Sequence, residues 1–106
     1  MKQFSHIGIP SSVMREGETY MEDAKLYVTD FAVSDNQIEW LRFEEGSPMP
    51  EALQTIAHIA FKVVDLEQAL AGREILIEPF EPKEGLKVAF ILAEGAPIEL
   101  MQEVGA

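Results

Sequence analysis

The sequence predicts an α+β domain built from two similar halves, and three observations support this prediction. The only two histidines, His6 and His58, occupy equivalent places in the strand-like segments 5–9 and 57–61, which are 52 residues apart (58 − 6) in a chain of 106. Further residue pairs recur at a nearly constant spacing. The second half also shows a regular βαβββ order of elements, which the first half follows with defects.

The further pairs recur at a spacing of 49 residues (94 − 45 for the first). They are Glu45 with Glu94, Gly46 with Gly95, Pro48 with Pro97 and Phe31 with Phe80, and the strand-like runs 25–28 and 39–43 match 74–77 and 88–92. Repeats that stack into solenoids need about three copies or more, so two copies indicate a duplicated unit that closes one domain. We therefore expect a single domain over residues 1–106, with module one about 1–54 and module two about 55–106.

In the first half, Pro10 and Gly17 interrupt the position where a helix should follow the first strand. Pro48 and Pro50 flank the place of the fourth strand and favour an edge strand or no strand there. The expected elements are strands at 4–9, 25–29 and 37–44, a short helix at 18–23 and a degenerate fourth strand at 49–53.

The second half is more regular. Asp65 is suited to cap a short helix over 66–71, with Gln68 placed to complete a capping box and Gly72 to end the helix. Strands are expected at 56–64, 74–78, 86–93 and 97–102, with a proline-rich turn over 79–85.

Composition excludes several classes of protein. The net charge is −11, with 19 acidic and 8 basic residues, and no basic cluster is present for nucleic-acid binding. No apolar run approaches the roughly 20 residues of a membrane helix, and the N-terminal residues enter a strand without the pattern of a signal peptide. The chain has no cysteine. We expect a cytoplasmic protein that binds a small molecule, neither nucleic acid nor membrane.

Strand alternation predicts which polar groups share a face. His58 should lie with Ile56 and Ala60, opposite the more apolar face that packs beneath the helix. By the same rule His6 and Glu99 lie on the side of His58. Two histidines and a carboxylate are ligands that suit Fe(II), Mn(II), Ni(II) or Zn(II), so His6, His58 and Glu99 are the candidate metal ligands.

These segments resemble the vicinal oxygen chelate superfamily, which includes glyoxalase I, methylmalonyl-CoA epimerase, extradiol dioxygenases and bleomycin-resistance proteins. The resemblance is carried by the runs 6–9, 58–61, 65–70 and 97–102 and covers nearly the whole chain. It implies two βαβββ modules that form a cupped mixed sheet around a divalent metal ion. It also implies ligands from the first and fourth strands of each module, which again selects His6, His58 and Glu99.

The fourth ligand is where the sequence departs from this pattern. The spacing of 49 places Pro50 opposite Glu99, and the adjacent Glu51 would substitute if its strand slips by one residue. Glu39 is an alternative, but the same spacing matches it to Val88, on the face expected beneath the helix. Glu51 is therefore the weak fourth candidate, and Glu39 ranks below it.

The same alternation presents Trp40 and Arg42 on the cupped face, together with Ala89 and Ile91. Arg42 would hold a substrate carboxylate or phosphate, and Trp40 would stack on a planar or apolar ligand. Their alternative roles are a surface salt bridge and ordinary core packing. Because the first half is small, a homodimer partner is expected to complete the pocket.

Two functions follow from these features. The first is a metal-dependent lyase or isomerase of the glyoxalase or epimerase type, in which Glu99 or Glu51 also transfers protons. The second is a metal-free binding module of the antibiotic-sequestering kind, for which an acidic surface suits a cationic ligand.

Overall fold

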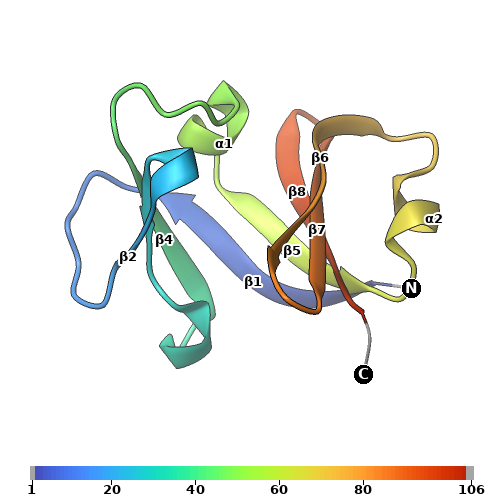
Figure 1. Cartoon of the computed structure of the whole chain (residues 1–106), viewed down its shortest axis with the longest axis horizontal. Helices are drawn as coiled ribbons and strands as arrows, with labels where there is room; N and C mark the ends of the chain where they lie inside the picture. Colours follow the sequence, from blue (N-terminus) through green and yellow to red (C-terminus); the bar gives the residue numbers. More distant parts are fainter. Residues whose placement is uncertain (1, 105–106) are drawn as a thin grey trace.

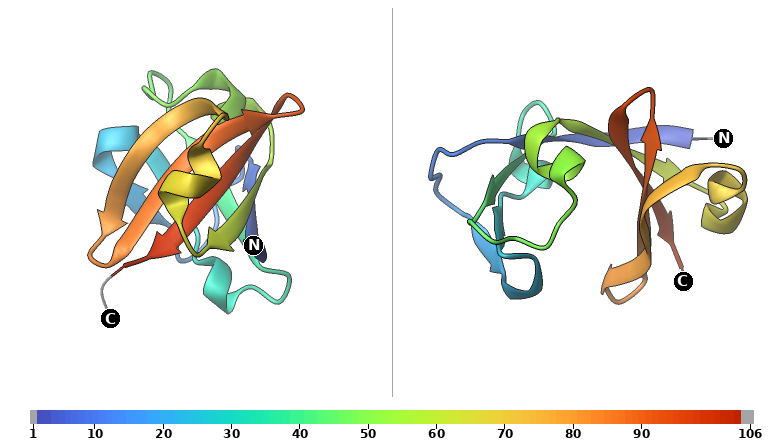
Figure 2. Two further views of the ribbon diagram at one scale, coloured as in Figure 1. Left: turned by 90° about the vertical axis from the view of Figure 1, so that its right-hand side faces the viewer. Right: turned by 90° about the horizontal axis from the view of Figure 1, so that it is seen from above.

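The computed structural model describes residues 2–104, and its strands form one curled, mixed sheet (Figures 1 and 2). The strands are β1 (Lys2–Pro10), β2 (Thr19–Met21), β3 (Leu26–Val28), β4 (Ile38–Phe43), β5 (His58–Val63), β6 (Glu74–Lys83), β7 (Leu86–Ala93) and β8 (Ala96–Glu103). Their order across the sheet is β2-β3-β4-β1-β5-β8-β7-β6. Counted outward from the centre, each half has the same order of first, fourth, third and second strand. The cupped α+β architecture, expected from the repeat together with the resemblance, is confirmed.

The two halves join through β1 and β5, which pair antiparallel at the centre of the sheet. Each of these strands then pairs in parallel with the last strand of its own half, β1 with β4 and β5 with β8. The two outer arms bend to the same side, so that the sheet is U-shaped when seen from above (Figure 2). The inner face of this cup carries both histidines.

The register of the parallel pairs defines the repeat more accurately than the sequence spacing does. Gly8 lies opposite Glu39 in the first half, and Ala60 lies opposite Glu99 in the second. Glu39 is thus the equivalent of Glu99, at a spacing of 60 residues (99 − 39). The constant spacing of 49 is wrong, because the second and third strands of module one are much shorter than those of module two. This spacing aligned β3 with β6, whereas the counterpart of β3 in the sheet is β7.

The helix of module two, α2 (Leu66–Leu70), lies where it was predicted, on the outer face of the sheet (Figure 1). The Asp65 carboxylate accepts a hydrogen bond from the backbone N–H of Gln68 and caps the first turn. Leu66 is buried against a cluster on that face that includes Ala89, Ile91 and Leu100. This contact fixes which sheet face is turned away from the cup.

Module one differs from its predicted elements in two places. Residues 18–23 do not form a helix; the chain instead makes strand β2 and the short 3-10 helix η1 (Glu22–Ala24). The predicted fourth strand near 49–53 is wrong as well, since the helix α1 (Glu51–Thr55) begins there after Pro50. A second 3-10 helix, η2 (Phe31–Val33), lies earlier in the chain. The true fourth strand is β4, which was predicted as the third.

The inner face has its own apolar cluster. Leu53 of α1 is 3% exposed and packs with Ala60, Val88, Phe90 and Met101 from the strands of module two. Helix α1 therefore closes one end of the cup. None of the helices in the described part of the chain is long and apolar enough to cross a membrane.

Candidate metal centre

Four polar side chains converge on the inner face, one from each of the four central strands. They are His6 of β1, Glu39 of β4, His58 of β5 and Glu99 of β8, and one ligand atom from each lies within 4.8 Å of all the others. His58 Nε2 is 3.0 Å and His6 Nε2 is 3.3 Å from Glu99 Oε1, and each Nε2 is 3.7 Å from Glu39 Oε1. Ligands about 2.0–2.2 Å from one metal ion lie roughly 3 Å from their neighbours, so the group is close to a ligand set already.

His6 is held with one ring nitrogen directed into this group. The side chain is 2% exposed, and its ring stacks on Phe31 with centroids 3.9 Å apart. Ser5 Oγ lies 3.0 Å from Nδ1, so this nitrogen already has a hydrogen-bond partner. Nε2 is buried and has no hydrogen-bond partner among the described residues, although Glu99 Oε1 lies 3.3 Å away. A buried polar atom without a partner is costly, and a metal ion would satisfy it.

His58 depends on a glycine across the strand pair. Gly8 lies opposite His58 in the register of β1 and β5, and a Cβ atom at Gly8 would collide with the imidazole ring. The ring also makes an edge contact with Phe90, with centroids 5.2 Å apart. Gly8 therefore makes room for the ring, and Phe90 restrains it, so that Nε2 reaches Glu99.

The two carboxylates differ in protonation. Burial raises the pKa of Glu39 to about 7, and the negative charge of Glu99 adds to this effect. Burial also opposes ionisation of Glu99, but its contacts with His58 and His6 outweigh it and lower the pKa to about 2. Near neutral pH the site thus holds one firmly ionised carboxylate and one that readily exchanges a proton.

The structure brings together three predicted ligands, His6, His58 and Glu99, and adds Glu39 as the fourth. Glu51 lies in the first turn of α1, exposed and outside the group. The signal for Glu39 was present in the sequence, because Ile38-Glu39 imitates Ile98-Glu99. It was outweighed by the spacing of 49, which assigned Glu39 to the wrong strand and hence to the wrong face.

Trp40 and Arg42 were predicted on the cupped face, and this placement is wrong. They alternate with Glu39 and Leu41 along β4, and their contacts lie with the loop after β1 rather than in the cup. Arg15 stacks over the Trp40 ring at 3.8 Å, and Arg42 makes a two-bonded ion pair with Glu18. Ala89 and Ile91, predicted with them, belong to the cluster beneath α2.

A cavity of about 580 Å³ adjoins this group, and two of the four residues, His58 and Glu39, form part of its wall. The rest of the wall comes from both arms of the sheet and from α1. The cup thus has room for a small molecule beside the candidate ligands.

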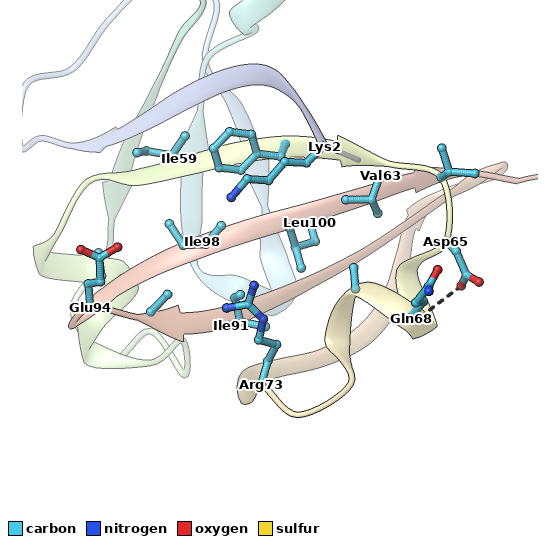
Figure 3. Close-up of a pocket in the computed structure, with 15 residues that line it drawn as sticks. Lys2, Ile59, Val63, Asp65, Gln68, Arg73, Ile91, Glu94, Ile98 and Leu100 are labelled. Atoms are coloured by element: carbon cyan, nitrogen blue, oxygen red, sulfur yellow. Dashed lines mark hydrogen bonds between the residues drawn. The ribbon is translucent and has the colours of Figure 1, made fainter.

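A second hollow of about 930 Å³ lies on the outer face, between α2 and the strands of module two (Figure 3). Its floor is apolar, with Ile59, Ile98 and Leu100, and Lys2 and Arg73 extend over it. The four candidate ligands are absent from its wall. We therefore place the candidate metal centre in the cup.

Two four-stranded modules joined edge to edge in one cupped sheet form the vicinal oxygen chelate fold, and this chain has that fold. Among solved structures it is similar to the hypothetical protein BH1468 from Bacillus halodurans C-125, with a TM-score of 0.74, 20% sequence identity, and coverage of 99% of this chain and 96% of the other. It is also similar to methylmalonyl-CoA epimerase from Mycobacterium tuberculosis, with a TM-score of 0.65, 18% identity, and coverage of 97% and 89%. No family model and no curated protein matches the sequence.

Proposed function

We propose that this protein is a divalent-metal-dependent enzyme that moves a proton on a small oxygenated substrate, as an isomerase or lyase of the glyoxalase or epimerase type. The observation that carries the proposal is the convergence of His6, Glu39, His58 and Glu99 on the inner face. The repeat relates them in pairs, and the buried Nε2 of His6 lacks a partner. The likeness to an epimerase in fold agrees with this proposal.

The four residues have two proposed roles, metal binding and proton transfer. A divalent ion held by them supplies Lewis-acid stabilisation of negative charge on substrate oxygens. Glu99 stays ionised, because its pKa is about 2, and serves as a permanent ligand. Glu39, which faces the cavity beside His58, takes a proton from the substrate at a carboxylate oxygen and returns it. Phe90 and Leu53 line the cavity and keep bulk water from the exchanging proton.

Metal content is the first test. The protein is stripped with a chelator, reloaded separately with Ni(II), Mn(II), Fe(II) or Zn(II), desalted and analysed for metal. We expect near-stoichiometric metal in the wild type and almost none in His6→Ala/His58→Ala. Glu51→Ala is the matched control, because this exposed carboxylate lies outside the group, and it should retain metal.

The reaction is tested with hydroxyacetone, a small neutral molecule with oxygens on neighbouring carbons. Exchange of its carbon-bound protons for deuterium, followed by NMR in D2O, should require metal and fall at least a hundredfold in Glu39→Gln. Failure of the wild type to retain any of the four metals would overturn the proposal. The cup would then be better explained as a metal-free binding site for a small ligand.

A further inference from the structure

We propose that the cup selects neutral or cationic substrates with an apolar body, and that it discriminates against anionic ones such as thioesters of coenzyme A. This inference rests on the proposed function, because the substrate is taken to bind beside the four candidate ligands. The proposed substrates also differ from the coenzyme A thioester in the name of the epimerase that shares this fold.

Most of the wall of the cavity beside the candidate ligands is apolar. Met49 and Leu53 contribute from the segment around α1, and Ile77, Phe80 and Phe90 contribute from the opposite arm. Leu26, Val28 and Leu41 complete the wall on the side of module one. A volume of about 580 Å³ suits a molecule of modest size whose body lies against these side chains.

The charged residues of the wall all have one sign. Glu22 and Asp23 of η1 stand on one side of the mouth, and Glu81 of β6 stands on the other. All three are exposed, whereas Glu39 lies deeper beside His58. Among the described residues that line this cavity there is no lysine or arginine. An anionic group entering the mouth would therefore meet carboxylates from both arms and no lysine or arginine side chain of the wall.

None of the lysine and arginine side chains in the described part of the chain lines the cavity, although Lys83 follows the lining residues Glu81 and Pro82 at the end of β6. Arg42 is paired with Glu18 and lies over Tyr27, and Arg15 stacks on Trp40. Lys25 follows η1, but its ammonium group lies beside Gly46 and does not line the cavity. Lys2 and Arg73 extend over the outer hollow, on the other face of the sheet (Figure 3). The wall of the cup is therefore acidic, in a chain with a net charge of −11.

Three catechols give a matched test, because each offers neighbouring oxygens to a metal and carries a two-carbon side chain, which ends in a different charge. Dopamine is cationic, 4-ethylcatechol is neutral and 3,4-dihydroxyphenylacetate is anionic at pH 7. Their affinities are measured by anaerobic titration calorimetry with protein loaded with the metal that it retains. We expect dopamine and 4-ethylcatechol to bind at least about tenfold more tightly than 3,4-dihydroxyphenylacetate at low ionic strength.

The variant Glu22→Gln/Asp23→Asn/Glu81→Gln should reduce the ratio between dopamine and 3,4-dihydroxyphenylacetate by about tenfold. The matched control Glu16→Gln/Asp35→Asn/Glu103→Gln removes the same number of charges from exposed sites outside the wall, and the ratio should be unchanged.

The outcomes separate the two proposals. If no metal is retained, the proposed function and this inference both fall. If the metal is retained but the anionic catechol binds as tightly as the others, only the charge selection is overturned. An equal effect of the two triple variants would also overturn it, because the selection would then come from the net charge of the protein rather than from the mouth of the cup.

Discussion

Burial of Glu39 makes its ionised form unfavourable in the folded protein, although the proposed proton transfer needs that ionised form. Its pKa rises from 4.5 to about 7 because the carboxyl group is buried and faces Glu99. A carboxyl group whose pKa is raised by folding binds its proton more tightly in the folded state. The stability that it contributes is fully present below pH 4.5 and is lost as the pH rises through 7. Glu99 has the opposite sign, since its lowered pKa gives stability that is lost only as the pH falls from 4.5 toward 2.

Removing the charge of Glu39 should therefore stabilise the metal-free protein at high pH. We expect Glu39→Gln to gain about 2.5 kcal/mol in free energy of unfolding at pH 8 relative to its effect at pH 5, because most of the pKa shift from 4.5 to about 7 takes effect between these two pH values. Urea unfolding at the two pH values, with a chelator present, measures this difference. Glu51→Gln is the control and should show no such pH dependence. An effect of Glu39→Gln that is equal at both pH values would show that burial does not raise the pKa of this carboxyl group.

Gly8 leaves the space that the His58 ring occupies. Gly8→Ala should displace the His58 ring and weaken metal binding at least about tenfold, because the added methyl group would occupy the place of the imidazole. Competition with a chromophoric chelator measures the affinity. Gly17→Ala is the matched control: its Cβ would contact nothing, but its φ of 79° makes alanine unfavourable by about 1 kcal/mol. It should lose stability and keep its metal, whereas normal metal affinity in Gly8→Ala would contradict this role.

At the scale of elements, the sequence predicted the strands well and the relation between the two halves less well. Alternation correctly placed His6, His58 and Glu99 on one face, because side-chain direction in a strand depends only on local sequence. The fourth ligand required the alignment of β4 with β8, which depends on how many residues lie between the first and fourth strands of each half. Strands β2 and β3 have three residues each, and their counterparts β6 and β7 have ten and eight. A difference in strand length of this kind is set by tertiary packing and leaves no periodic signal in the sequence.

The loop over 11–18 takes the place that α2 has in module two, and two arginines hold it on the outer face. Arg42 donates hydrogen bonds from Nε and Nη2 to Glu18, at 3.0 and 2.7 Å. We expect Arg42→Ala to release the loop and increase the rate of tryptic cleavage after Arg15, as followed by mass spectrometry. Metal and catechol affinities should not change, because Arg42 lies outside the cup. Arg73→Ala, an exposed arginine away from the loop, is the control; a loss of ligand affinity in Arg42→Ala would instead favour its predicted role in substrate binding.

At the scale of the whole molecule, the candidate site is shared equally between the two halves. His6 and Glu39 come from module one, and His58 and Glu99 come from module two. The direct contact between the halves within the sheet is the pairing of β1 with β5. A metal ion held by all four residues would add a further connection to this pairing and to the packing of Leu53 on module two, so that metal binding and the stability of the complete cup are linked.

This linkage predicts a large thermal shift. At a free metal concentration a hundred times the Kd, binding to the folded state adds about 2.7 kcal/mol, which for a domain of this size raises Tm by about 10 °C or more. Each variant is compared with its own metal-free form by calorimetry: Glu99→Gln should lose most of the shift, and the exposed control Glu94→Gln should keep it. Hydrogen exchange then distinguishes a shared site from a local one. Metal should slow exchange in β4 and β8 alike, because these strands carry Glu39 and Glu99, whereas protection confined to one half would mean that the ion is held by one module and does not connect the two.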